Sequence, residues 1–109
     1  MKLYLDTSTE ICSLKIDDYE YNWASGKDLA EGLHQFIREK LSQHGGTWQD
    51  ITEITFFSGP GSFTGLRIGA TVVNTLANEL GIPLYNHHGK KLKMILPEYG
   101  RGANITIPK

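Results

Sequence analysis

A glycine-rich run between two apolar segments limits the fold more than any other feature of the chain. The run is residues 58–69, and it follows the apolar stretch 54–57, which is typical of a buried strand. An apolar-periodic stretch, residues 66–80, comes next and ends at Gly81, with Pro83 two residues later. Glycine just past the last helical residue, with proline beyond it, is a helix stop signal. The glycines therefore mark a corner at which a strand turns into a helix.

This corner admits two interpretations. Gly59 and Gly61 allow backbone angles that other residues resist, and Pro60 stiffens the turn. Ser62 or Thr64 can cap the helix, whose free N–H groups would then face the turn and could bind an anion. No Gly-Lys-Ser/Thr follows, however, and the glycine spacing departs from the dinucleotide fingerprint. A tight turn that docks a helix on a sheet is therefore favoured over a phosphate-binding loop.

The composition predicts one globular domain. The chain has 109 residues, of which 39% are hydrophobic and 21% charged, and its net charge of −1 gives no overall field for nucleic acid. Its single cysteine, Cys12, excludes an internal disulfide and fits a reducing compartment. No basic-then-apolar leader is present, and no apolar run approaches about twenty residues. We therefore expect a cytoplasmic protein that does not contact membranes.

The remaining segments predict an α/β fold. One apolar and two alternating segments, joined by turns, indicate an antiparallel meander, and a helix, a strand, a helix and a last strand follow. The last strand should run parallel to the preceding one because a helix crosses between them. We expect strands at 3–5, 11–16, 19–23, 53–57 and 82–85, helices at 27–43 and 63–80, one lobe over 1–88 and a basic tail over 89–109.

A carboxylate and two neighbouring hydroxyl side chains follow the first predicted strand. Asp6, Thr7 and Ser8 could hold a metal and phosphate, or could form a turn in which they satisfy their own backbone groups. The composition favours the second interpretation. His34 lies off the apolar stripe of its helix and should be solvated.

The adjacent histidines His87 and His88 are expected to be a structural or surface pair. Neighbouring residues of a strand point to opposite faces, and no third metal ligand stands at a workable spacing. The chain becomes basic after them, at Lys90, Lys91, Lys93, Arg101 and Lys109. A basic segment of this kind more often increases solubility than binds RNA, and both interpretations remain open.

The two helices differ in how much of their surface is apolar. The first has one apolar face, as expected of a helix that packs on a sheet, with or without a partner on it. In the second, Ile68 and Val72 extend the apolar arc well beyond half the circumference. One sheet face cannot cover so wide an arc, so we favour a partner interface here over a fully internal core.

The glycine run resembles the central signature of the TsaB family, and the opening turn Asp6-Thr7-Ser8 is similar to the first phosphate loop of the actin-like ATPases to which TsaB belongs. The resemblance implies one actin-like, ribonuclease-H-like lobe with a five-stranded mixed sheet. Segment 96–106 is similar to the closing Pro-x-Tyr-x-Arg segment of TsaB, which implies a short form without the second lobe. Leu29 and Ala30 stand where TsaB has a His-Ser pair, so no role of that histidine is carried over. The signature residues are Gly59, Pro60, Gly61, Ser62, Phe63, Thr64, Gly65, Leu66, Arg67, Ile68 and Gly69.

The resemblance also implies a function. TsaB is the partner of TsaD, which transfers threonylcarbamoyl to adenosine in tRNA, and TsaE joins them in bacteria. We therefore expect a subunit without catalytic residues, cofactor or metal that pairs with TsaD, or with itself, through its two helices, with tRNA contact indirect or through the tail. TsaD's own metal site, with two histidines four apart on a helix, has no match here. The expected contact residues are Leu29, Leu33, Phe36 and Ile37 from the first helix, and Leu66, Ile68, Val72, Val73 and Leu76 from the second.

Two rival functions stay open. One is a small nucleotide-binding or hydrolytic enzyme that uses the Asp6-Thr7 turn and the Gly59–Gly61 loop. The other is an RNA-binding accessory that uses the basic tail. No nucleophile and base stand at a spacing that indicates a catalytic triad.

Overall fold

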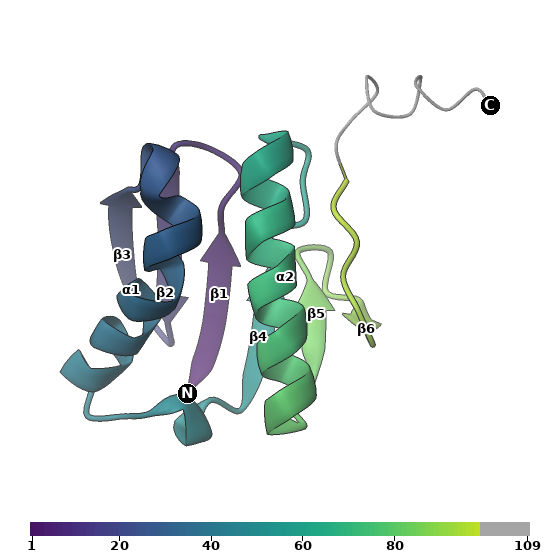
Figure 1. Cartoon of the computed structure of the whole chain (residues 1–109). Coiled ribbons are helices and arrows are strands. Elements are labelled where there is room, and N and C mark those ends of the chain that lie inside the picture. Colours follow the sequence, from purple (N-terminus) through teal and green to yellow (C-terminus); the bar gives the residue numbers. More distant parts are fainter. Residues whose placement is uncertain (99–109) are drawn as a thin grey trace.

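The chain folds into one mixed sheet with both helices on the same face (Figure 1). The computed structural model describes residues 1–98. Six strands lie in the order β3-β2-β1-β4-β5-β6. The elements are β1 (Lys2–Asp6), β2 (Ile11–Ile16), β3 (Tyr19–Ala24), the 3-10 turn η1 (Gly26–Asp28), α1 (Leu29–Gln43), η2 (Trp48–Asp50), β4 (Glu53–Phe56), α2 (Phe63–Leu80), β5 (Leu84–Asn86) and β6 (Lys91–Leu92).

The predicted meander and crossover are confirmed. β1 pairs antiparallel with β2 in the register Leu3↔Ile16, and β2 pairs antiparallel with β3. β1 and β4 run parallel, as do β4 and β5, because α1 and α2 carry the chain back across the sheet. The carboxyl ends of β1, β4 and β5 therefore meet at one edge of the sheet.

Both ends of α2 carry the predicted signals. The Ser62 hydroxyl accepts a hydrogen bond from the Gly65 amide at 3.2 Å, which caps the first turn. Gly81 ends the helix in the left-handed conformation, with φ of 66°. Helix α1 begins two residues later than predicted because the chain first makes the turn η1. Among residues 1–98, no helix is both long enough and apolar enough to cross a bilayer.

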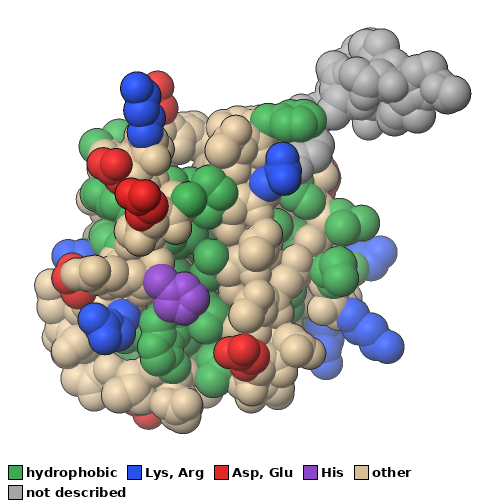
Figure 2. Space-filling view, in the orientation of Figure 1, with side chains coloured by type: hydrophobic (Ala, Val, Ile, Leu, Met, Phe, Trp, Pro, Cys, Tyr) green, Lys and Arg blue, Asp and Glu red, His purple; other side chains and the backbone are tan. Residues whose placement is uncertain are grey.

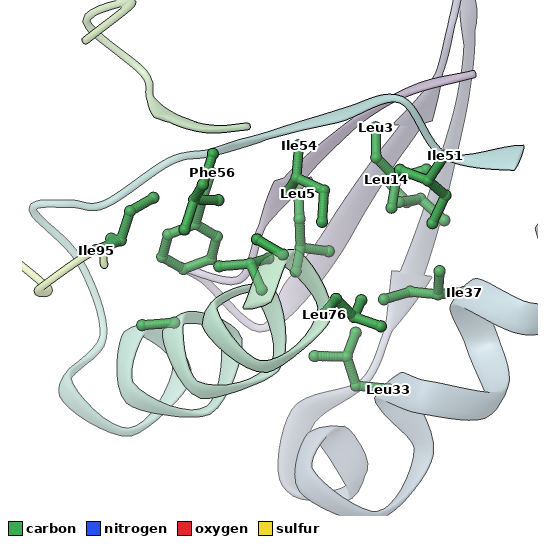
Figure 3. Packing of buried hydrophobic residues seen from close by; sticks show 14 of the residues in the cluster. Leu3, Leu5, Leu14, Leu33, Ile37, Ile51, Ile54, Phe56, Leu76 and Ile95 are labelled. Atoms are coloured by element: carbon green, nitrogen blue, oxygen red, sulfur yellow. The ribbon is translucent and has the colours of Figure 1, made fainter. Parts of the chain in front are cut away.

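The core lies between the helices and the inner face of the sheet. Leu5 of β1 and Ile54 and Phe56 of β4 point toward the helices, where Leu33 and Leu76 meet them (Figure 3). These side chains are at most 6% exposed. The opposite face of the sheet carries polar and aromatic side chains in the alternate positions, among them Tyr4, Lys15, Thr55 and Tyr85.

The sheet has one strand more than the five predicted. The short strand β6 comes from the basic segment and pairs antiparallel with β5. After it, Ile95 is 1% exposed and belongs to the core cluster. The Asn74 side chain of α2 fixes this segment, because its amide donates to the Ile95 carbonyl at 3.0 Å and its oxygen accepts from the Ile95 amide at 2.7 Å. The packed lobe thus continues past residue 88, and residues 99–109 of the predicted tail lie outside the described residues.

Candidate functional site

The carboxyl edge of the parallel strands gathers the polar residues of interest. Open α/β sheets bind ligands at this edge, outside the carboxyl ends of their strands. Here it brings together the Asp6 turn after β1, the glycine corner after β4 and the histidine pair after β5.

The polar side chains of the Asp6 turn are hydrogen-bonded within the turn or to α2. Oδ1 of Asp6 accepts hydrogen bonds from the Ser8 amide at 2.8 Å and the Ser8 hydroxyl at 2.6 Å. The Thr7 hydroxyl is fully buried and donates to the Gly65 carbonyl of α2 at 2.7 Å. The Asp6–Ser8 contacts are those of the turn that the composition favours, whereas the Thr7 hydroxyl bonds to α2 instead of to the turn.

The glycine corner brings α2 against the opening turn. A Cβ atom on Gly61 would lie 2.5 Å from the Ser8 Cβ, and one on Gly69 would lie 2.6 Å from the Phe56 ring. Gly59 has a φ of 124°, which side-chain-bearing residues rarely adopt. The glycines therefore permit a close helix-to-strand approach, which is the docking turn favoured from the sequence.

A pocket of about 790 Å³ lies beside this corner, between the first turns of α1 and α2. Its lining includes Ser8, Glu10, Lys27 and Ser62. Asp6 and Thr7, the residues that the rival nucleotide-binding interpretation requires, are not among its lining residues.

A polar cluster at the end of β5 was missed by the sequence analysis. The Ser58 hydroxyl donates to Oε2 of Glu98 at 2.9 Å and lies 3.2 Å from Nδ1 of His87, while the Ser58 amide donates to the same Nδ1 at 3.1 Å. Nε2 of His88 is 3.9 Å from Oε2 of Glu98. His87, His88 and Glu98 each offer one possible metal-ligand atom, and these three atoms all lie within 4.8 Å of one another. Glu98 therefore lies beside the two histidines, although its position in the sequence does not indicate a third ligand.

This cluster is not arranged as a catalytic triad. Ser58 is only 1% exposed, so its hydroxyl is closed to a substrate, and it donates to the carboxylate directly rather than through an imidazole. The thiol of Cys12 is equally unsuited to nucleophilic attack, because burial, helped by Asp6, raises its pKa to about 12.

Most of the predicted contact residues belong to the chain's own core. Leu29, Leu33, Ile37, Leu66, Val73 and Leu76 are at most 6% exposed. Phe36 is half-buried and packs on Trp23 of β3, with 5.1 Å between ring centroids. Ile68 and Val72 are half-buried on α2, and hydrophobic side chains are visible between the two helices in Figure 2. His34 is exposed, as predicted, with its ring 5.2 Å from that of Trp48.

Ile68 and Val72 line a shallow hollow on the helical face. It measures about 400 Å³, and Arg67 lies at its margin. We call this surface the α1/α2 hollow; its lining residues are Ala30, Thr64, Arg67, Ile68, Thr71 and Val72.

Comparison with known proteins places this fold in a family. Residues 24–90, more than half of the chain, match the family model described as "TsaD: tRNA N6-adenosine threonylcarbamoyltransferase". The "tRNA threonylcarbamoyladenosine biosynthesis protein TsaB" of Haemophilus influenzae is 36% identical over 87 residues, which are 75% of this chain and 36% of that protein. The chain belongs to the TsaD family and is a TsaB-type member of it.

A solved structure of YeaZ from Pseudomonas aeruginosa matches this TsaB-type chain with a TM-score of 0.69 and 34% identity, covering 78% of the chain and 42% of YeaZ. The lobe therefore has the actin-like fold of this neighbour. A tRNA N6-adenosine threonylcarbamoyltransferase of Pyrobaculum aerophilum is 47% identical over 54 residues, or 49% of the chain and 16% of that enzyme. The chain spans less than half the length of each of these relatives.

Proposed function

We propose that this TsaB-type chain acts in tRNA threonylcarbamoyladenosine biosynthesis, as a non-catalytic subunit that binds a TsaD-type transferase through the α1/α2 hollow. The observation that carries the proposal is the pair Ile68 and Val72, one helical turn apart, which pack against the core on one side and remain partly exposed in the α1/α2 hollow on the other. Partly exposed apolar side chains that line a groove are typical of protein contact sites.

The other residues of the hollow suit a helix as the bound element. Ala30, Thr64 and Thr71 are small, so a second helix can approach the surface closely. Arg67 stands at the margin, where it can pair with an acidic side chain of the partner while remaining hydrated. The contact surface is therefore narrower than the sequence suggests, because six of the nine predicted residues serve the internal core.

The burial of nucleophilic groups supports a non-catalytic role. Ser58 and Cys12 are both closed to solvent, and the Asp6 turn engages its own hydroxyls. We assign the transfer chemistry to the TsaD-type partner, with TsaE joining the assembly and tRNA contacting this chain only indirectly or through its basic tail. The proposed location is the cytoplasm.

Mass measurement by size-exclusion chromatography with light scattering tests the pairing. The chain mixed with TsaD of the same organism should elute as a one-to-one complex, and Val72→Asp should abolish it because an unpaired carboxylate would be buried at the contact. Tyr19→Asp is the matched control, since Tyr19 is 62% exposed and lies at the tip between β2 and β3. Loss of the complex in both variants, or in neither, would contradict the assignment of the surface.

Measuring the mass of the chain without TsaD gives a second test of the surface. The same surface should support a weak homodimer, so the measured mass should rise with concentration for the wild type and remain monomeric for Val72→Asp. Titration with ATP and magnesium addresses the rival nucleotide-binding function, and the scaffold proposal expects no heat of binding.

A further inference from the structure

We propose that His87, His88 and Glu98 form a binding site for a divalent transition-metal ion of the zinc class. The three residues come from two separate segments, the loop after β5 and the segment that follows Ile95. One ligand atom from each residue lies within 4.8 Å of the other two, although Glu98 stands 10 positions after His88 in the sequence. This proposal does not depend on the proposed function.

Both segments are fixed in place before an ion binds. Oδ1 of Asn86 accepts hydrogen bonds from the backbone amides of His88 at 2.9 Å and of Lys90 at 3.0 Å, which shapes the histidine loop. On the other side, the Glu98 amide donates to the Ser58 carbonyl at 2.5 Å, and the Ser58 hydroxyl donates to the Glu98 carboxylate at 2.9 Å. The loops thus present the donors from opposite sides of one small space.

The ligand atoms need only a small rearrangement to reach coordination distance. In a tetrahedral zinc site with metal–ligand bonds of about 2.0–2.2 Å, ligand atoms stand roughly 3.3–3.6 Å apart. The His88 and Glu98 side chains are 63% and 50% exposed, so each can change its rotamer without disturbing the core. Nε2 of His88 and Oε2 of Glu98, at 3.9 Å, are already near the required separation.

The donor set selects the class of ion. Two imidazoles and one carboxylate suit zinc and its neighbours, whereas magnesium and calcium require oxygen ligands. Three protein ligands leave the fourth position of a tetrahedron to water. This ligand set differs from a metal site formed by two histidines four residues apart on a helix. Here the two histidines are adjacent in a loop, and the third ligand is a glutamate.

Ser58 links two of the ligands, and its amide sets the tautomer of His87 in the metal-free protein. Its amide donates to Nδ1 of His87, so the neutral ring carries its proton on Nε2. Coordination through Nε2 moves this proton to Nδ1, where the Ser58 hydroxyl 3.2 Å away can accept it while still donating to Glu98. The Ser58 amide loses its acceptor in that exchange, so its resonance reports on binding.

Competition against a chromophoric chelator, with the full chain and Zn²⁺ as probe, tests the site. The wild type should bind one Zn²⁺ and no Mg²⁺. His88→Ala and Glu98→Gln change exposed side chains and should weaken zinc binding at least about tenfold, and Ser58→Ala should weaken it about 10- to 100-fold as the loss of an outer-shell partner. His34→Ala removes another exposed imidazole elsewhere and should leave the affinity unchanged.

Nitrogen NMR gives a readout that is independent of folding stability. Zinc should shift the ring nitrogens of His87 and His88 and the amide of Ser58, and should leave the rings of His34 and His44 unshifted. Absence of zinc binding by the wild type overturns the proposal. Equal affinity of His88→Ala, Glu98→Gln and wild type, with all three folded by circular dichroism, overturns it as well.

Discussion

Substituting Gly65 by alanine tests whether the glycine corner exists for close packing. A Cβ atom at this position of α2 would lie 2.1 Å from the Thr7 carbonyl oxygen, about 1.3 Å short of ordinary van der Waals contact. The obstructing atom belongs to the backbone of the opening turn, so no side chain can rotate away. The helix or the turn must move.

The expected loss of stability has three contributions. Overpacking of this kind destabilises by about 1–3 kcal/mol. The shift also strains the hydrogen bond from the Thr7 hydroxyl to the Gly65 carbonyl, and losing the partner of a buried hydroxyl costs about 1–3 kcal/mol. Alanine regains about 1 kcal/mol of helix propensity over glycine. The balance is a decrease of roughly 1–5 kcal/mol in the free energy of unfolding.

Urea denaturation followed by far-ultraviolet circular dichroism measures this change. Thr75→Ala serves as the control, because Thr75 is exposed on the same helix and its replacement should stabilise slightly through propensity alone. A Gly65→Ala protein as stable as the wild type, or more so, would show that the helix does not approach Thr7 as closely as described. The docking interpretation of the corner would then fail.

Three further changes have defined outcomes. Asn74→Ala should lower the free energy of unfolding by about 1–3 kcal/mol and speed hydrogen exchange at Ile95, because both backbone groups of Ile95 lose their partner. Gly81→Ala should lower the melting temperature, with a cost of about 1–2 kcal/mol for a left-handed residue with φ of 66°. Unfolding titrations should show stability falling as pH rises above 9.0, the ordinary pKa of the Cys12 thiol, because the unfolded thiol ionises there while the folded one stays neutral until about pH 12. Cys12→Ala should flatten that dependence, and an unchanged slope would assign it to other groups.

The elements that were predicted correctly carry their signals within a few residues. The bounds of α2 follow from Ser62, from the apolar period and from Gly81, all within one segment. The meander follows from alternation along each strand. By contrast, β6 has only two residues in a basic stretch, and its pairing with β5 is a tertiary effect with no periodic signature.

The polar cluster could not be predicted because its members are distant in the sequence. Glu98 stands 40 residues from Ser58, and the packing of Ile95 against the core, with its hydrogen bonds to Asn74, brings this segment back to the sheet edge. The burial of six of the nine predicted contact residues could not be predicted for a related reason. The periodicity of α2 shows how much of the helix is apolar, but it cannot show that α1, packed alongside, covers part of that arc with Leu33 and Ile37.

Because both helices pack on one face of the sheet, alternate positions along each strand should differ in which substitutions they tolerate. Alternate positions of the strands face the core, so Leu3 and Leu5 of β1 are constrained by packing, while the alternating Lys2 and Tyr4 face away from it. Tolerance to random substitution should therefore vary with a period of two along β1 and β2, and as a single stripe along each helix. The sheet face opposite the helices can accumulate changes that leave the fold intact, which makes it the part of the lobe most open to acquiring new contacts.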